Sequence, residues 1–194
     1  MMRVRWLLLI IAVSLAACGS HSFAGVVGDP PPPAGDFTLT DQTGTDFKLS
    51  DLTGKWVLMA YGYTHCPDVC PLTLSILRDV RKSLGAQANQ LAVVFVTIDP
   101  ERDTAEIMGK YAAHFDPSFK ALSGTLEQIA AAAKPYNVKY EKAASTSAAD
   151  YAMKHTAFIY LIDPRFRWRV TFPFGVKSEE IASDLKYLMQ AEQK

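Results

Sequence analysis

Two apolar runs are the most regular hydrophobic features of the chain: residues 56–61 are continuous, and residues 91–98 contain Thr97 as their one polar position. Such runs are typical of strands that are buried on both faces of a sheet. Ahead of them, residues 36–40 and 46–50 alternate apolar and polar positions around the turn sequence Asp-Gln-Thr-Gly at 41–44. This alternation predicts a β-hairpin at the start of the folded region.

Helical spacing follows the first apolar run, with a glycine suited to a helix C-cap at Gly85. The apolar positions with this spacing are Leu72, Ile76, Leu77, Val80 and Leu84. Three further helices are predicted from their caps and apolar positions. The first is capped by Asp103 or Thr104 and ends before Asp116-Pro117, and the other two cover residues 125–134 and 178–189.

The remaining pattern predicts short strands and one long loop. A short strand is predicted near residues 119–122, and the polar, small-residue stretch 141–149 has the composition of a loop. Residues 156–162 and 166–172 flank Asp163-Pro164 and should pair as antiparallel strands.

The predicted element order is β-β-β-α-β-α-β-α-β-β-α. Parallel crossover units come first and an antiparallel hairpin comes near the end, which indicates an α/β fold with a mixed central sheet and flanking helices. This layout resembles the thioredoxin-like fold, with an extra N-terminal β-hairpin. We expect one such domain over residues 36–194, a normal size for a single domain.

The N-terminus has the pattern of an export signal. Arg3 and Arg5 precede an apolar stretch that ends at Leu15. The sequence Leu-Ala-Ala-Cys at 15–18 resembles the lipobox of bacterial lipoproteins, in which cleavage before the cysteine leaves a lipid on its sulfur. We therefore expect a lipoprotein signal peptide over 1–17, lipidation at Cys18 and a location in the bacterial cell envelope, on the extracytoplasmic side.

Two alternatives to this interpretation remain. One is an ordinary secretory signal that leaves a stray free cysteine in an exported protein. The other is an uncleaved membrane helix, although the apolar run is shorter than the roughly 20 residues that a span needs.

Residues 18–35 lack apolar periodicity and contain four consecutive prolines, Pro30 to Pro33. Such a run favours stiff polyproline II structure, so we expect a tether that holds the domain away from a membrane, with His21 solvated within it. Without Arg3 and Arg5, the 20 basic residues fall to 18 against 20 acidic residues, a formal charge of −2. The sequence has no basic stripe, so it argues against nucleic acid as a partner.

Cys66 and Cys70 follow the first apolar strand in the sequence Tyr-Thr-His-Cys-Pro-Asp-Val-Cys-Pro. We expect the regular helix to start at Pro71, because proline suits the first helical position and disrupts a helix interior. The positive helix end would then favour thiolates at both sulfurs, although Asp68 adds an opposing charge.

Two kinds of chemistry suit this cysteine pair. Three residues separate the cysteines, instead of the two of the thioredoxin redox motif. A longer, proline-stiffened spacer can hold two sulfurs around a metal ion, and thiolates select Cu(I) or zinc over hard cations. Redox exchange, with a disulfide between Cys66 and Cys70, is the second possibility, and two buried, inert cysteines are the third.

A histidine is the expected third donor. His21 lies in the predicted tether, His114 near a helix end, and His65 should point away from its neighbour Cys66. His155 precedes a buried strand, at the position that faces the cysteines in a thioredoxin-like fold. It is the best candidate, and a plain loop histidine is the alternative.

Three sequence blocks resemble the Sco/SenC family. They are Tyr-Gly-Tyr-Thr-His-Cys-Pro-Asp-Val-Cys-Pro-Leu-Thr-Leu at 61–74, Thr-Ile-Asp-Pro-Glu-Arg-Asp-Thr at 97–104, and Tyr-Ala-Met-Lys-His-Thr-Ala-Phe-Ile-Tyr-Leu-Ile-Asp-Pro at 151–164. The resemblance implies copper, as Cu(I), Cu(II) or both, bound by Cys66, Cys70 and His155.

The same resemblance implies a role and partners. The protein would be a membrane-tethered copper chaperone that receives copper from an upstream donor and assists assembly of the CuA centre of cytochrome c oxidase. The chain departs from the family at Lys154, where members often have aspartate. A cation beside the histidine would weaken Cu(II) binding or slow its capture.

The alternative function is that of a thiol-disulfide oxidoreductase, which keeps exported or oxidase cysteines reduced. Peroxidase activity is the weakest possibility, because Thr64 stands two residues before Cys66, whereas the peroxiredoxin pattern needs three. We interpret Asp99-Pro-Glu-Arg-Asp103 as a strand-terminating turn before a helix, in preference to a catalytic site.

Overall fold

The computed structural model describes residues 21–143 and 151–192 as a single α/β unit. The expected signal peptide over 1–17 and the expected lipidation site, Cys18, lie outside the described residues. The strands are β1 (Val26–Val27), β2 (Thr38–Asp41), β3 (Asp46–Lys48), β4 (Trp56–Gly62), β5 (Leu91–Thr97), β6 (Lys120–Ser123), β7 (Tyr140–Lys142), β8 (Met153–His155), β9 (Ile159–Ile162) and β10 (Trp168–Phe172). The α-helices are α1 (Val69–Ser83), α2 (Ala105–Ala113), α3 (Leu126–Ala133) and α4 (Ser178–Ala191).

Eight strands form one mixed sheet in the order β1-β10-β9-β4-β5-β6-β2-β3. β4 pairs parallel with β5 and antiparallel with β9, and every residue of β4 is buried, as its uninterrupted apolar run predicts. The four strands β10-β9-β4-β5 give the thioredoxin-like core that the element order predicts. The predicted N-terminal hairpin is confirmed as β2 and β3, which extend the opposite edge of the sheet.

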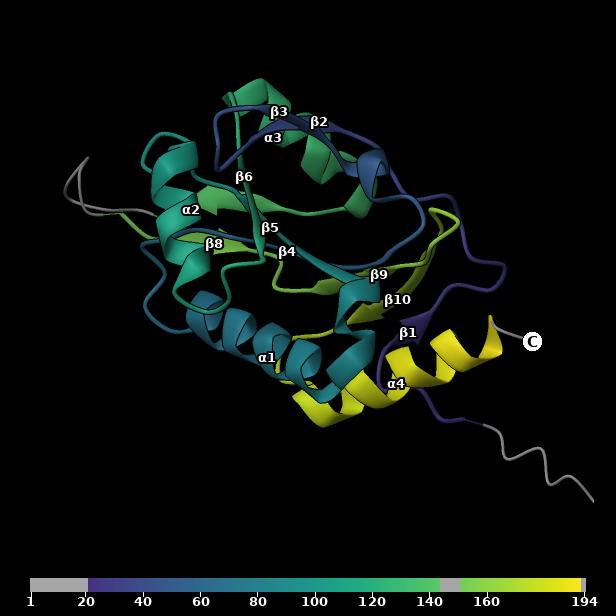
Figure 1. Cartoon of the computed structure of the whole chain (residues 1–194). Helices are drawn as coiled ribbons and strands as arrows, with labels where there is room; N and C mark the ends of the chain where they lie inside the picture. The colour runs from purple at the N-terminus through teal and green to yellow at the C-terminus, as the bar shows by residue number, and fades with distance from the viewer. Residues whose placement is uncertain (1–20, 144–150, 193–194) are drawn as a thin grey trace, which may run out of the picture.

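The helices cover both faces of this sheet (Figure 1). α1 and α4 lie side by side on one face, α3 lies on the other, and α2 lies beside β6. The predicted antiparallel pair near the end of the chain is confirmed as β9 and β10, which meet at a turn around Asp163. Buried apolar side chains from both sheet faces therefore form one continuous core.

The segment before β2 differs from the expected free tether. Residues 21–35 pack along the edge of the sheet, where β1 pairs with β10 and Pro33 forms a bridge with Arg167. His21 Nε2 donates a 2.7 Å hydrogen bond to the buried carboxylate of Asp184, and the ring stacks on Tyr187. Hydrophobic periodicity in the sequence does not predict this packing, because the strand that pairs with the sheet is only two residues long.

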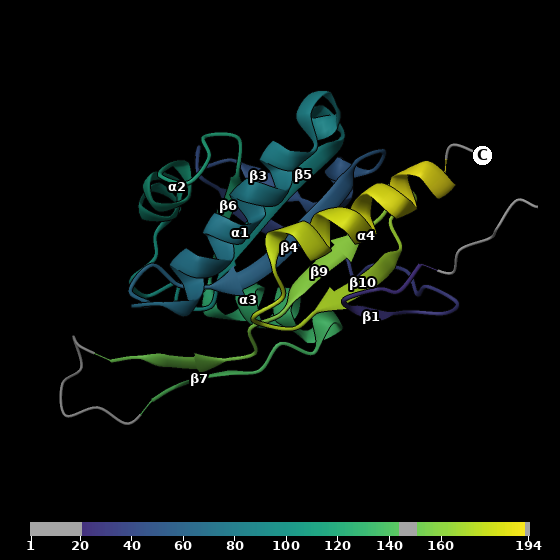
Figure 2. The same cartoon turned by 90° about the horizontal axis from the view of Figure 1, so that it is seen from below.

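β7 and β8 form a second, two-stranded sheet that pairs only with itself among the described residues. Seen from below, this ribbon extends beyond the body of the domain, at the end opposite the C-terminus of α4 (Figure 2). The sequence predicts a loop over 141–149, whereas the structure extends strand pairing to Lys142. Short strands with polar side chains have little apolar alternation, so the pattern could not distinguish them from a loop.

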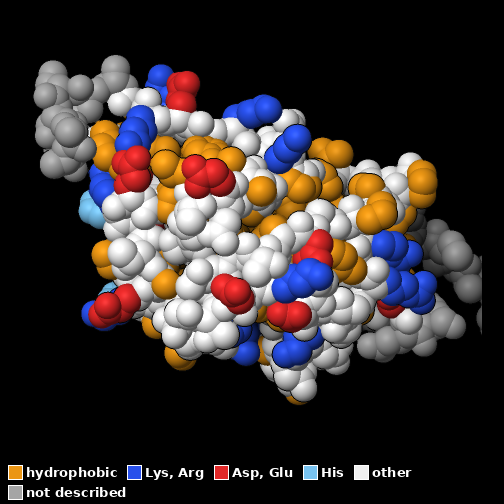
Figure 3. Space-filling model, turned by 90° about the horizontal axis from the view of Figure 1, so that it is seen from above, with side chains coloured by type: hydrophobic (Ala, Val, Ile, Leu, Met, Phe, Trp, Pro, Cys, Tyr) orange, Lys and Arg blue, Asp and Glu red, His pale blue; other side chains and the backbone are white. Residues whose placement is uncertain are grey.

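Charges on the face seen from above are mixed (Figure 3). Basic and acidic side chains alternate over this face and do not gather into areas of one sign. No helix within residues 21–143 and 151–192 combines the length and the apolar character needed to cross a bilayer.

Candidate metal centre

Cys66 and Cys70 lie where β4 gives way to α1, at the carboxyl end of a central strand, a common location for sites in open α/β sheets. The regular helix begins at Val69, two residues earlier than predicted. The Asp68 side chain caps it by accepting a hydrogen bond from the Val69 amide at 2.6 Å. Pro71 is the third helical residue, where an amide would have no helical partner, so it costs the helix no hydrogen bond.

Cys70 is therefore a helical residue, and it lies on the buried face of α1. Its thiol is 2 % exposed and shares this face with Leu74, Leu77 and Val80. Leu72, which we expected on that face, is 48 % exposed, because it lies two residues from Cys70 on the helix.

The two sulfurs have different environments, which corrects the prediction of thiolates at both positions. Burial raises the pKa of the Cys70 thiol well above its usual range, and this effect outweighs the nearby helix terminus. Cys66 is half-buried, and its sulfur accepts a hydrogen bond from the Cys70 amide at 3.4 Å. Both cysteines are free thiols in this structure.

His155, the last residue of β8, faces Cys70. Its Nε2 atom lies 3.9 Å from the Cys70 Sγ atom. Its Nδ1 atom lies 2.9 Å from the Thr156 carbonyl oxygen, which can only accept, so Nδ1 carries the hydrogen. The Nε2 lone pair therefore points toward the thiol, and burial lowers the pKa of the ring, which keeps it neutral.

The 3.9 Å separation suits two ligands of one ion. Metal bonds of about 2.3 Å to sulfur and about 2.0 Å to nitrogen can bridge at most roughly 4.3 Å. Within residues 21–143 and 151–192, however, no three histidine, cysteine or carboxylate side chains are already arranged closely enough to hold an ion. Binding by all three donors would thus require Cys66 to move closer to Cys70 and His155.

The other histidines lie away from this centre. His65 is exposed, as expected, and its Nδ1 atom lies 3.1 Å from the Thr64 hydroxyl. His114 is the C-cap residue of α2, which agrees with the predicted helix-end position. His21 is bound to Asp184, in contrast to the expected solvated linker residue.

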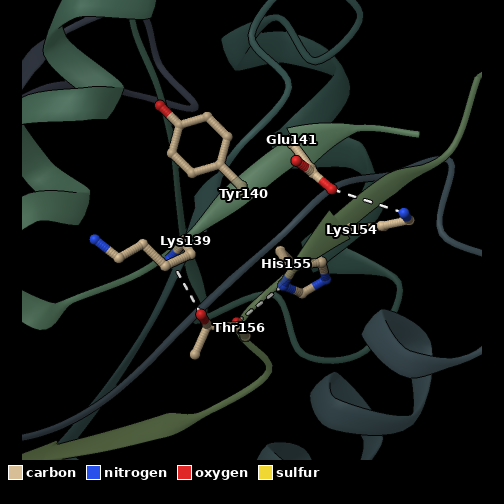
Figure 4. Close-up of a pocket in the computed structure, with 6 residues that line it drawn as sticks. All are labelled: Lys139, Tyr140, Glu141, Lys154, His155 and Thr156. Carbon is tan, nitrogen blue, oxygen red and sulfur yellow. Dashed lines mark hydrogen bonds and ion pairs between the residues drawn. The ribbon is translucent and has the colours of Figure 1, made fainter. Parts of the chain in front are cut away.

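Lys154 points away from the thiols although it precedes His155. Successive strand residues face opposite sides, and Lys154 is exposed while His155 is half-buried. Its ammonium lies 3.7 Å from the Glu141 carboxylate, across the ribbon (Figure 4). A hollow of about 340 Å³ lies beside His155, lined also by Lys139, Tyr140, Glu141, Lys154 and Thr156.

Tyr63 is a residue of the site that the sequence reasoning missed. Its ring lies 6.1 Å from the His155 ring in an edge-on arrangement, and its hydroxyl accepts a hydrogen bond from the Met153 amide at 3.2 Å. Its carbonyl accepts a hydrogen bond from the Cys66 amide. The sequence signal that could have identified Tyr63 was its position, three residues before Cys66 and directly after a buried strand.

Comparison with known proteins identifies the family. A sequence profile described as SCO1/SenC matches residues 28–190. The chain belongs to the SCO1/SenC family. The mouse protein "SCO2 homolog, mitochondrial" is 41 % identical over 132 residues, which cover 67 % of this chain and 52 % of the mouse protein. The chain thus spans about half the length of this mitochondrial family member.

Solved structures of the family have the same fold. ScoI of Bradyrhizobium japonicum, determined with copper bound, is 41 % identical and superposes with a TM-score of 0.73, covering 80 % of this chain and 98 % of ScoI. Apo Sco1 of Thermus thermophilus is 34 % identical with a TM-score of 0.79, covering 87 % of this chain and 98 % of that one. The predicted thioredoxin-like fold is confirmed.

Proposed function

We propose that this protein is a copper chaperone that takes up copper through Cys66, Cys70 and His155 and passes it to a client. The observation that carries the proposal is the 3.9 Å approach of the His155 Nε2 lone pair to the Cys70 sulfur. The copper-bound ScoI structure supports the choice of metal. Two thiolates and an imidazole also suit copper better than hard cations.

The donor set explains how copper would be both held and released. Copper is the cargo, and three donors leave a position through which a thiolate or imidazole of a receiving protein can attack. As the metal enters, the buried Cys70 thiol loses its proton to solvent and becomes the thiolate that binds the metal. His155 needs no proton loss, because its hydrogen is on Nδ1 and its Nε2 atom is already unprotonated.

The family supports a proposal for the client, and the N-terminal sequence supports a proposal for the location. We propose the subunit that carries the CuA site of cytochrome c oxidase as the client, and an upstream copper-binding protein as the donor. The lipobox at Cys18 supports a lipid anchor in the bacterial envelope, with the domain on the extracytoplasmic side. Since residues 21–35 pack against the domain, this anchor would hold it close to the membrane.

A His155→Ala variant tests the copper proposal, with His114→Ala as the matched control. Reduced protein is titrated anaerobically with Cu(I) against a competing chelator. We expect His155→Ala to bind copper at least about tenfold more weakly, because one of three donors is lost. Equal copper affinity in the His155→Ala variant and the wild type would contradict the three-donor site.

Thiol-disulfide exchange is the second candidate function, and the unequal environments of the cysteines favour it. Cys66 is half-exposed and suits attack on a client disulfide, while Cys70 is buried beside it and suits resolution of the mixed disulfide. The same His155→Ala variant should reduce a model disulfide at the wild-type rate. Rapid disulfide reduction by a protein that takes up no copper would favour this function over copper transfer.

A further inference from the structure

The β7–β8 ribbon that carries His155 cannot hold its own position. It forms a two-stranded sheet separate from the main sheet. An isolated two-stranded hairpin is at best marginally stable in water. Contacts with the rest of the domain must therefore fix the place of His155 relative to the cysteines.

The inward face of β8 and of the two residues before it supplies these contacts. Tyr151, Met153 and His155 are buried or half-buried, whereas Ala152 and Lys154 between them are exposed. This alternation places Tyr151 and His155 on one face, four residues apart, or about 13 Å along an extended chain. Tyr151 thus anchors the face whose other end carries the metal-facing histidine.

Tyr151 is held by the loop that follows β5. Its hydroxyl donates a 2.6 Å hydrogen bond to one carboxylate oxygen of Asp99, and the Arg102 Nε atom donates a 2.5 Å hydrogen bond to the other. Asp99 is only 2 % exposed. Burial, together with the Asp99 carboxylate, raises the pKa of Tyr151 to about 12, so the hydroxyl remains a donor at neutral pH.

Arg102 adds a second contact to the same anchor. Its guanidinium lies 3.6 Å from the centroid of the Tyr151 ring and 5.8 Å from that of Tyr63. Such stacking is strongest where the cation is shielded from water, and the Arg102 side chain is only 14 % exposed. At the end of β7, Lys142 forms an ion pair with Glu101 of the same loop.

The loop also contacts the cysteine segment. The Asp103 carboxylate, fully buried, accepts hydrogen bonds from the Thr64 amide at 3.0 Å and from the Thr64 hydroxyl at 2.5 Å. Thr64 lies two residues before Cys66. Because β4 and β5 are parallel neighbours, their carboxyl ends bring this loop and the cysteine segment together.

We propose that Asp99, Arg102 and Tyr151 are positioning residues that set the distance between His155 and the two thiols. The loop 99–103 holds the cysteine segment through Asp103 and the histidine ribbon through Asp99 and Arg102. It therefore has a function beyond that of a strand-terminating turn. This inference rests on the proposed copper site, because it names the residues that hold the three copper donors of that site at their positions.

Tyr151→Phe is the sharpest test, because it removes the hydrogen bond to Asp99 and keeps the ring that stacks on Arg102. The matched control is Tyr160→Phe, which removes another buried tyrosine hydroxyl, the donor to the Tyr136 carbonyl oxygen at 3.1 Å. The full chain is compared in detergent by Cu(I) competition, by electron paramagnetic resonance of the Cu(II) form, and by amide hydrogen exchange of copper-free protein.

We expect Tyr151→Phe to bind copper about tenfold more weakly, with reduced nitrogen coupling in the Cu(II) spectrum. It should also exchange the amides of β8 faster, while Tyr160→Phe keeps wild-type values in all three measurements. Asp99→Asn should repeat the effects of Tyr151→Phe, because an amide is a weaker acceptor for both Tyr151 and Arg102.

Wild-type copper affinity and nitrogen coupling in Tyr151→Phe would overturn the inference, even if exchange were faster, since the donors would then be positioned without this contact. If the wild-type protein takes up no copper, the proposed function fails on that result alone. In that case hydrogen exchange alone tests the positioning role. Faster exchange of the β8 amides in Tyr151→Phe would support it, and unchanged exchange would overturn it.

Discussion

The Nε2 atom of His155 lies 3.9 Å from the Sγ atom of Cys70, although 85 positions separate the two residues in the sequence. The thiol is nearly fully buried and the imidazole presents a free lone pair. The Cys70 sulfur is thus protonated, whereas the His155 Nε2 atom is not. This difference determines how the site should respond to pH, to alkylation and to substitution.

Copper affinity should rise with pH. Burial raises the pKa of Cys70, so the copper-free protein keeps this proton at neutral pH, while the copper complex does not. Each proton released on binding strengthens apparent affinity by about tenfold per pH unit. His155 adds no further dependence at pH values above its usual pKa, because burial lowers that pKa and the ring is already neutral there.

Anaerobic Cu(I) competition between pH 6 and 8 measures this dependence, with a chelator of known proton stoichiometry as the reference. A flat profile would show that Cys70 is not deprotonated on binding. It would therefore argue against its role as a ligand.

Cys66 should be alkylated faster than Cys70 in the reduced, copper-free protein. Cys66 is half-exposed, whereas Cys70 is 2 % exposed and its raised pKa leaves little thiolate. We expect the rates with iodoacetamide at pH 8 to differ by more than about tenfold. Peptide mass spectrometry of timed samples measures both rates, and equal rates would contradict the structural asymmetry.

Gly62→Ala should disturb the packing around the Cys70 sulfur and lower the stability of the protein. A Cβ atom at this position would lie 2.7 Å from the Cys70 sulfur and 2.8 Å from the Phe95 ring. We expect a loss of about 1–3 kcal/mol in the free energy of unfolding, because these packed neighbours have to shift. Denaturant titration of wild type and variant measures the loss, and unchanged stability would mean that Cys70 is not held as tightly as the packing indicates.

Lys154→Ala should change copper affinity by less than about fivefold, since exposed ion pairs contribute only about 0–1 kcal/mol. The ammonium lies on the outward face of β8 beside Glu141, away from the thiols. The sequence suggested that a cation before the histidine would weaken Cu(II) binding. A large gain in Cu(II) affinity in Lys154→Ala would support that earlier expectation against the geometry.

The regular parts of the fold were predictable because their burial leaves a regular hydrophobic pattern. β4 and β5 are buried on both faces and have apolar runs, whereas the strands of the N-terminal hairpin are buried on one face and alternate. The final β9–β10 pair followed from its two short segments around Asp163. The start of α1 was placed two residues late, since the prediction assigned Pro71 to the first helical position and overlooked Asp68 as the cap.

The supporting parts of the site were not predictable in the same way. The packing of residues 21–35 depends on a two-residue strand and a buried partner, Asp184, more than 150 positions away. The role of Asp99 and Arg102 was hidden because a turn before a helix uses the same residue types. The structure reveals what this turn contacts, because Tyr151, two residues before β8, points inward and donates a hydrogen bond to Asp99.

X-ray absorption spectroscopy of the reduced, Cu(I)-loaded protein tests the central claim most directly. The account predicts copper bound by two sulfurs and one nitrogen in the wild type, and by two sulfurs without that nitrogen in His155→Ala. A nitrogen ligand that persists in His155→Ala, or a wild-type spectrum with fewer than two sulfurs, would contradict it.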